Sequence, residues 1–287
     1  MAERTYKMYI NGEWIDAESG AIHKDINPYT GEVFATGPSG GTADAVKAVD
    51  AAQAAFPEWA RINPTERRNL LLKAADIIEK RTDDLFAILA QETGCAFPAS
   101  MVQVSNAPEF FREAASHVFD VEGKIFPSQN PDTVSMMWRL PVGVVASISP
   151  WNAALLLGLR GIVFPLAYGN TVVHKPSEAA PIAGGVVIAE VLEEAGFPKG
   201  VFNLVTNGAG KSREIGDVWT SDDRVRRMTF TGSTEVGIHL TVQCAQNMKK
   251  ICCELGGSCP LLVLHDSYVE YPVRRAIAGL YLPPGPV

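Results

Sequence analysis

Four short stretches of this sequence place polar side chains just after a run of apolar residues. They contain Asn152 in SPWN, Lys175 and Glu178 in HKPSE, Ser233 in FTGSTEVG and Glu254 in CELGG. An amide can donate a hydrogen bond to a carbonyl oxyanion, and a carboxylate at the mouth of an apolar pocket can act as a general base. A lysine and a carboxylate together can bind the two hydroxyls of a ribose. These residue types therefore suit nucleotide binding and carbonyl chemistry.

Each of these residues also has an ordinary structural interpretation. The alternatives are a turn-forming Asn152, a solvated ion pair between Lys175 and Glu178, a helix cap at Ser233 and a surface carboxylate at Glu254. Gly232 and Gly237 favour the nucleotide interpretation, because glycine lets a pyrophosphate approach the backbone at a helix N-terminus. Taken one at a time, most of these residues are better explained structurally, so their combination matters.

A second glycine-rich turn, VFNLVTNGAGKSREIG, supports a different hypothesis. Its Gly-Lys-Ser at 210–212 matches the second half of a Walker A phosphate loop, and LLVLHD at 261–266 could be a Walker B strand. The Walker A motif needs a glycine where Val205 stands, since that glycine lets the loop wrap round the phosphate. The G-x-G-x-x-G spacing is absent as well. A nucleoside triphosphatase is therefore a weaker alternative.

Beyond residue 141, short apolar runs alternate with amphipathic stretches. We expect strands near 142–149, 171–175, 201–206, 227–231 and 250–255, with helices between them. This alternation predicts an α/β fold, a Rossmann-like doubly wound parallel sheet whose ligands bind at the carboxyl ends of the strands. PLLVLHD then predicts a further strand, and the stretch from about Asp266 to Leu280 predicts a helix.

The N-terminal part contains a hairpin signal and long helical patterns. YINGEWI has Asn-Gly between apolar residues, which is typical of a hairpin turn. Apolar residues then recur at helical spacing, with Thr42 and Thr65 as expected N-caps and Gly94 as the expected stop. DTVSMMWRLPVGVV contains Pro141, so we expect an exposed ribbon there instead of a central strand.

The composition excludes several classes of protein. The 287 residues carry a net charge of −7 without any basic run, so nucleic acid is not an expected partner. The N-terminus has no apolar signal segment, and the most apolar later stretch is interrupted by Arg160 and Pro165, so neither export nor membrane insertion is expected. Five cysteines without a C-x2-C pair suit a cytoplasmic protein with buried thiols and no metal site.

Together, these motifs resemble the aldehyde dehydrogenase superfamily. The resemblance runs from YINGEWIDAESG and INPYTGEV to the end of the chain, with PWN, HKPSE, FTGSTEVG and CELGG in the family's order. It implies NAD-dependent oxidation of an aldehyde to a carboxylic acid, with Asn152 stabilising the oxyanion and Glu254 activating the hydrolytic water. The stretch PWNAALLLGLRGIVFPLAYG is similar to the branch that acts on aromatic aldehydes such as salicylaldehyde or vanillin.

The resemblance also implies a set of cofactor-binding residues. Glu178 would repel a 2′-phosphate, so NAD is expected and NADP is not. The set is Ile148, Ser149, Trp151, Lys175, Ser177, Glu178, Gly210, Phe230, Gly232, Ser233, Gly237 and Leu255.

The family further implies a cysteine nucleophile, which belongs one position beyond Val287 when the chain is aligned on CELGG. We therefore expect a chain truncated just before its catalytic cysteine and inactive as given. The expected parts are an NAD-binding domain (1–120 and 144–257), a bridging and oligomerisation ribbon (121–143) and the start of a catalytic domain (258–287). Full-length relatives would be homo-oligomers. The alternative is a non-catalytic nucleotide-binding or subunit-interaction protein.

Overall fold

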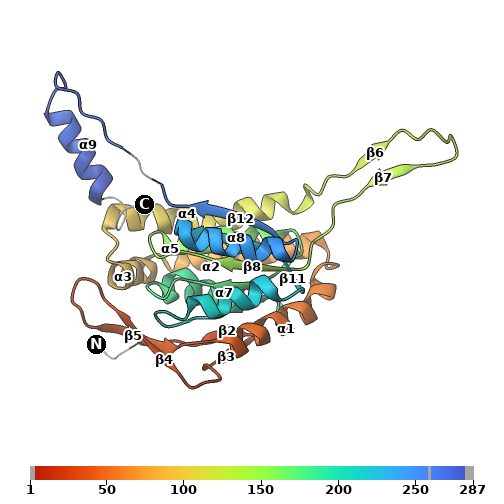
Figure 1. The fold of residues 1–287 in the computed structure, drawn as a ribbon, viewed down its shortest axis with the longest axis horizontal. Coiled ribbons are helices and arrows are strands. Elements are labelled where there is room, and N and C mark those ends of the chain that lie inside the picture. Colours follow the sequence, from red (N-terminus) through yellow and green to blue (C-terminus); the bar gives the residue numbers. More distant parts are fainter. Residues whose placement is uncertain (1–3, 258–259, 282–287) are drawn as a thin grey trace.

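A seven-stranded sheet forms the centre of the computed structural model, which describes residues 4–257 and 260–281 (Figure 1). The strand order is β12-β11-β8-β9-β10-β2-β3, and the first five strands of this order run parallel. Those five are β8 (Val144–Ile148), β9 (Thr171–Lys175), β10 (Phe202–Leu204), β11 (Val225–Gly232) and β12 (Lys250–Leu255). The predicted parallel sheet is confirmed, with each strand within a few residues of its expected bounds.

The N-terminal hairpin extends the sheet beyond β10. Strands β2 (Met8–Ile10) and β3 (Glu13–Ile15) are antiparallel, and β2 pairs antiparallel with β10. At the turn, Asn11 and Gly12 have φ of 55° and 75°, the positive values that a two-residue hairpin turn requires. A separate three-stranded sheet, β1-β5-β4, lies beside this hairpin. Its strands are β1 (Arg4–Thr5), β4 (Ile22–Ile26) and β5 (Val33–Pro38).

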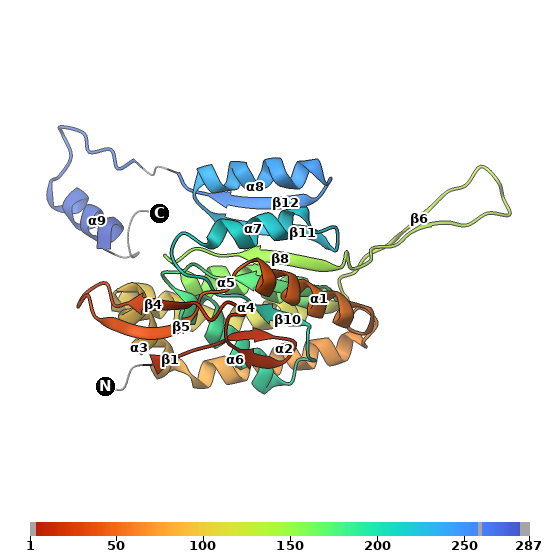
Figure 2. The ribbon, with the colours of Figure 1, turned by 60° about the horizontal axis from the view of Figure 1, so that its bottom comes forward.

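Helices cover both faces of the large sheet, and each face has its own apolar core (Figure 2). One face carries α1 (Thr42–Trp59), α7 (Ser212–Ser221) and α8 (Thr234–Gln246). The other carries α5 (Ala154–Ala167) and a π-helical turn, η2 (Ile182–Val186), that leads into α6 (Val187–Ala195). Outside these pack α2 (Pro64–Lys80), α3 (Thr82–Thr93), α4 (Phe97–Ser116) and the short η1 (His117–Phe119). The fold is therefore doubly wound, as predicted.

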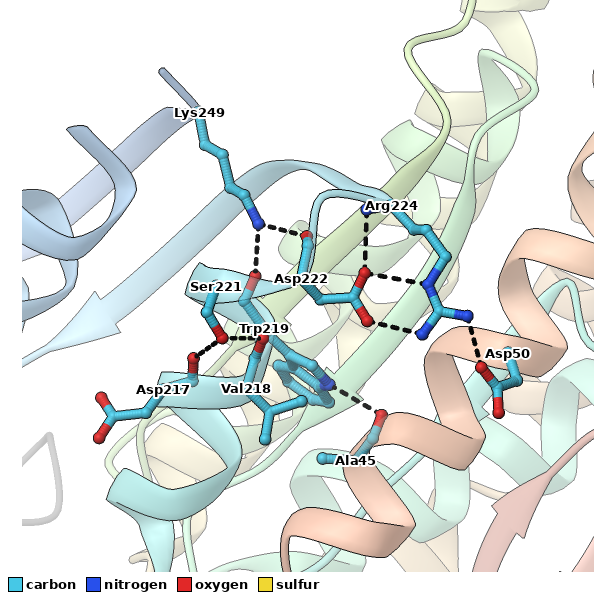
Figure 3. A network of polar contacts seen from close by, with 9 residues as sticks. All are labelled: Ala45, Asp50, Asp217, Val218, Trp219, Ser221, Asp222, Arg224 and Lys249. Carbon is cyan, nitrogen blue, oxygen red and sulfur yellow. Dashed lines mark hydrogen bonds and ion pairs between the residues drawn. The ribbon is translucent and has the colours of Figure 1, made fainter. Parts of the chain in front are cut away.

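A polar network joins α7, β11 and α1 at the amino end of β11 (Figure 3). Arg224 forms a bidentate pair with Asp222 and reaches Asp50 on α1 at 2.5 Å. Lys249 donates to the carbonyl oxygens of Trp219 and Asp222, which lie at the end of α7. Because these backbone carbonyls have no partner within the helix, the lysine stabilises the helix end. This network holds the strand end that lies opposite the predicted ligand edge.

Two segments stand away from the body at opposite ends of the molecule (Figures 1 and 2). Strands β6 (Lys124–Phe126) and β7 (Ser135–Met137) form an antiparallel arm whose residues are exposed, as expected for a ribbon. At the other end lies α9 (Glu270–Tyr281). The predicted strand at 260–266 is wrong, because these residues are exposed and have no neighbouring strand to pair with. Within the described residues, no helix is long and apolar enough to cross a bilayer.

The helix boundaries correct two details of the sequence analysis. Helix α1 is capped by Gly41, whose N–H donates to Asp44. Helix α2 is capped by Asn63, which accepts from the N–H of Thr65. Thr42 and Thr65 are therefore helical residues and not caps. The expected stop at Gly94 is confirmed, with the left-handed φ of 66° that ends α3.

The cysteines only partly follow the expectation of buried thiols. Cys95 and Cys244 are buried, but Cys252 is exposed and Cys253 is half-buried. The reason is that both lie on β12, which is an edge strand of the described sheet. Cys259 lies outside the described residues. No group of three or more His, Cys, Asp or Glu side chains that could hold a metal ion occurs in the part of the chain that the structure describes.

A buried pair of carboxyl groups ties the small sheet to the body. Asp25 on β4 and Glu92 at the end of α3 are each 2% exposed. Glu92 accepts hydrogen bonds from the N–H groups of Ile182 and Ala183, at 2.6 and 2.7 Å. Burial raises the pKa of Asp25 to about 7. Burial also raises the pKa of Glu92, so one of the two groups keeps a proton in the folded chain.

This pair predicts a pH-dependent stability. The folded-state pKa of Asp25 lies above its unfolded value, so the stabilisation is complete below about pH 4 and is lost as pH rises through about 7. Asparagine is uncharged at every pH, so we expect Asp25→Asn to remove the pH dependence that the Asp25 carboxyl group adds to the free energy of unfolding. The free energy of unfolding of the natural chain should fall relative to that of the variant between about pH 5 and about pH 7 in urea titrations. The control is Asp83→Asn, an exposed aspartate. A constant difference across this range would contradict the raised pKa of Asp25.

Candidate site at the carboxyl edge of the sheet

The strand register brings five of the twelve predicted cofactor residues to one edge of the sheet. Ile148 at the end of β8 is level with Lys175 on β9 and with Phe230 on β11. Gly232 at the end of β11 is level with Leu255 on β12. Ile148, Lys175 and Phe230 are buried, whereas Leu255 is 42% exposed. The edge therefore has a buried part beside β9 and an open part beside β12.

Lys175 is a buried cation whose hydrogen-bonding capacity is fully used. The side chain is 3% exposed, and its ammonium group donates to Pro176 O at 3.0 Å, Asn207 Oδ1 at 3.0 Å and Ser212 Oγ at 3.3 Å. An ammonium group has three donors, so all of them are satisfied by the protein. Burial lowers the pKa of Lys175 to about 8, and the nearby charge of Glu178 opposes this shift. A solvated ion pair, the structural alternative for this residue, is therefore wrong.

Ser212, the first residue of α7, links Lys175 to Glu178. Its hydroxyl accepts from Lys175 and from Asn207 Nδ2 at 2.9 Å, and it donates to Glu178 Oε2 at 3.2 Å. Asn207 is 1% exposed and also contacts Lys175 through its amide oxygen. The sequence pattern indicates Ser212 only as part of a phosphate loop and does not indicate Asn207 at all. Their position beside the predicted pair follows from the turn between β10 and α7.

A neutral histidine, His174, lies next to Lys175 on β9 and forms hydrogen bonds with β8 and η2. His174 is fully buried; its Nε2–H donates to Gly184 O at 2.9 Å, and its Nδ1 accepts from Ser147 Oγ at 3.0 Å. Ser149 Oγ lies 3.5 Å from Nε2, and Ser149 N donates to Lys175 O. Burial lowers the pKa of His174 to about 4, so the ring is uncharged near neutral pH. His174 begins the HKPSE stretch, but the sequence indicated no role for it.

Helix α5 approaches η2 closely at the carbonyl group that His174 binds. A Cβ atom built on Gly158 would lie 2.6 Å from Gly184 O, which is too short for a real contact. Glycine at this position therefore lets the helix pack directly on the backbone of η2.

The N-terminus of α8 forms the open part of the edge. Ser233 is its N-cap and accepts from the N–H of Val236 at 3.4 Å. The first N–H groups of a helix have no intrahelical acceptor, so this end suits an anion. Gly232 and Gly237 also have a packing role, because a Cβ at Gly232 would clash with the Phe230 ring and one at Gly237 would clash with Leu255.

The remaining predicted cofactor residues lie in turns around this edge. Ser177 accepts from the N–H of Ala179 at 3.3 Å, and Gly210 forms an exposed turn with φ of 78°. Trp151 is 38% exposed and borders, with Glu178, a cavity of about 400 Å³. The other residues lining this cavity are His23, Lys24, Asp25, Ile26, Pro28, Glu92, Thr93 and Ala179.

The two predicted catalytic residues are not brought together in the described part of the chain. Asn152 is half-buried after β8, and its Oδ1 accepts from Ala153 N at 3.0 Å. Among the described residues its amide nitrogen has no acceptor. Glu254 is exposed on β12, and β11 lies between β12 and β8. The apolar surroundings expected for Glu254 are therefore not formed by residues 4–257 and 260–281.

The phosphate-loop hypothesis is wrong, because the contacts of its lysine and serine do not fit it. Lys211 is exposed and pairs with Glu214 on its own helix at 2.8 Å. The Ser212 hydroxyl is occupied by Lys175, Asn207 and Glu178, and residues 261–264 form no strand that could supply a Walker B acid. The Gly-Lys-Ser sequence is thus an ordinary βα turn with an unexpected role for its serine.

Comparison with known proteins gives consistent matches over the whole chain. A family model described as "Aldehyde dehydrogenase family" matches residues 14–286. Salicylaldehyde dehydrogenase from Pseudomonas putida is 39% identical over 276 residues, which are 96% of this chain and 57% of that protein. Vanillin dehydrogenase from Pseudomonas fluorescens is 40% identical over 280 residues, 98% of this chain and 58% of that protein.

A solved structure of betaine aldehyde dehydrogenase from Staphylococcus aureus, in complex with NAD+, superposes with a TM-score of 0.89 at 35% identity. The alignment covers 96% of this chain and 54% of that one. This chain therefore spans a little over half the length of each of these three proteins.

The close approach of α5 and η2 predicts a large cost for a single methyl group. Gly158→Ala would push on the Gly184 carbonyl and disturb its bond with His174, so we expect it to lower the free energy of unfolding by about 1–3 kcal/mol. Gly256→Ala is the matched control, because a Cβ there meets no atom within 4 Å. Equal stabilities of the two variants in urea titrations would contradict the packing argument.

Proposed function

The chain belongs to the aldehyde dehydrogenase family, and we propose that residues 1–287 carry the NAD-binding part of an enzyme that oxidises an aldehyde to a carboxylic acid. The observation that carries the proposal is the arrangement at the carboxyl edge of the sheet. There a buried lysine and a nearby carboxylate lie beside a helix N-terminus. These are the groups that a ribose diol and a pyrophosphate need.

The residues present fit NAD without rearrangement of the fold. Glu178 uses one carboxylate oxygen for Ser212, so its other oxygen can accept from a ribose hydroxyl. Lys175 can donate to the same diol by exchanging its longest bond, the one of 3.3 Å to Ser212. The N-terminus of α8 then binds the pyrophosphate through its free N–H groups. The carboxylate disfavours a 2′-phosphate, so we propose NAD as the cofactor and not NADP.

For the reaction itself, Asn152 supplies an amide N–H that can stabilise the oxyanion of the attacked carbonyl. Glu254 can activate water once its surroundings are closed by residues beyond those described. NAD, when bound, supplies the hydride acceptor. We propose an aromatic aldehyde as substrate, because the relatives named for salicylaldehyde and vanillin are 39% and 40% identical to this chain.

The described thiols do not supply a nucleophile beside Asn152. Cys95 and Cys244 are buried in the two cores, while Cys252 and Cys253 lie on β12, which β11 separates from β8. We therefore propose that the thiol comes from residues that follow 287 in a longer protein. In the same proposal, 1–120 and 144–257 form the cofactor domain, 121–143 forms the bridging and oligomerisation arm and 258–287 begins the catalytic domain. The assembled protein would be a cytoplasmic homo-oligomer.

The cofactor preference is directly testable. Calorimetry should show tighter binding of NAD than of NADP by residues 1–287, and Glu178→Gln should narrow the difference because it removes the charge that repels the 2′-phosphate. Glu66→Gln, an exposed glutamate in the first turn of α2, is the control. Equal affinities for NAD and NADP in the unmodified chain would contradict the role of Glu178 in cofactor preference. Binding of neither nucleotide would contradict the proposed function.

Activity gives a second test. With NAD and a panel of aromatic and aliphatic aldehydes, residues 1–287 alone should produce no NADH, since loss of a covalent nucleophile costs on the order of 10⁴ to 10⁶ in rate. Fusing a C-terminal segment of a relative that begins with the cysteine should restore turnover. Robust turnover by the unfused chain, abolished by Cys253→Ala, would identify a different nucleophile. NAD binding without turnover in either form would favour the non-catalytic alternative.

A further inference from the structure

The Ser212 hydroxyl occupies an unusual place between two opposite charges. It accepts from Lys175 and Asn207 and donates to Glu178, so its one proton and both of its lone pairs are used. Lys175 and Glu178 are three residues apart in the chain, yet no ion pair joins them in the described structure; the hydroxyl lies between them. The serine thus separates two groups that would otherwise attract each other.

A direct ion pair between Lys175 and Glu178 would change the environment of both side chains. An ammonium buried to 3% exposure gains more from a carboxylate than from a neutral hydroxyl, because the Coulomb attraction is strong where water is excluded. A carboxylate that turned inward to meet Lys175 would no longer face an incoming diol. It would also be neutralised, and it would repel a 2′-phosphate less.

Asn207 makes the position of the hydroxyl rigid. Its amide nitrogen binds Ser212 Oγ at 2.9 Å and Gly208 O at 2.8 Å, while its amide oxygen binds Lys175. The cationic neighbours of Ser212 do not take part, since Lys211 pairs with Glu214 and Arg213 with Asp217. The hydroxyl of Ser212 is therefore the group of α7 that contacts the lysine and the carboxylate.

We propose that Ser212 is a positioning residue that keeps Glu178 and Lys175 apart and directs both toward the ribose diol, and that it thereby sets the preference for NAD over NADP. This inference rests on the proposed function, because it concerns the same nucleotide site. The Gly-Lys-Ser turn, which resembles half of a phosphate loop, thus serves the cofactor through its serine. When the diol binds, Lys175 gives up its long bond to Ser212, while Ser212 keeps its bonds to Glu178 and Asn207.

The test uses residues 1–287 and measures the Kd for NAD and for NADP by calorimetry. Ser212→Ala should weaken NAD binding by about tenfold, the usual effect of losing a hydrogen bond to a charged group. NADP binding should change less, because a neutralised Glu178 repels the 2′-phosphate less. Ser212→Thr keeps the hydroxyl and should retain the natural preference. Ser221→Ala is the matched control, since Ser221 lies at the other end of α7 and its hydroxyl binds only carbonyl groups of its own helix.

A double-mutant cycle separates positioning from a general structural effect. In the Glu178→Gln background, which removes the charge that Ser212 directs, Ser212→Ala should lose most of its effect on the NAD/NADP ratio. Additive effects, tighter NAD binding by Ser212→Ala, or an unchanged ratio would each overturn the inference. If the unmodified chain binds no NAD, the proposed function fails first. If it binds NAD and Ser212→Ala behaves like Ser221→Ala, only the role of Ser212 is wrong.

Discussion

A buried ammonium group at the end of β9 constrains the arrangement around it. Lys175 can stay charged in the interior only if each of its three donors has an acceptor, since an unpaired buried donor is costly. The acceptors come from the turn that follows its own strand, from the turn after β10 and from the start of α7. Those three segments are therefore held together by one side chain. The geometry of these turns at the carboxyl edge of the sheet follows from satisfying the three donors of Lys175.

Two other buried polar side chains near this edge of the sheet also bond to neighbouring segments of the chain. Glu92 is buried and accepts hydrogen bonds from the N–H groups at the start of η2, while the Nε2–H of His174 donates a hydrogen bond to a carbonyl oxygen in the same turn. A π-helical turn leaves backbone groups out of the usual i to i−4 pattern, and these two side chains supply partners for them. The region beneath Lys175 and Glu178 is thus built from polar contacts, in a protein whose two cores are otherwise apolar.

The edge is asymmetric, and this asymmetry matters for function. Beside β9 the polar groups are buried and already bonded to one another, so a ligand must exchange contacts there. Beside β12 the groups are exposed, and Glu254 and Cys252 face solvent in the described structure. In the proposed function, a nucleotide would contact both the bonded groups beside β9 and the N-terminus of α8. The chain spans 57% of the length of a relative, and we propose that further residues of a longer protein close the open end.

The sequence by itself determined the parallel strands, the hairpin, the exposed ribbon and which polar residues follow the strands at the carboxyl edge of the sheet. Each of these depends on local pattern: apolar runs of strand length, an Asn-Gly turn, and the fact that parallel strands end at one edge. Only the tertiary structure decided that Lys175 is buried and that Ser212, 37 residues away, bonds to it. It also decided that Cys252 and Glu254 are exposed and that 260–266 forms no strand. These properties depend on whether a segment far away in the sequence covers the residue or pairs with it. The local sequence pattern does not identify that segment.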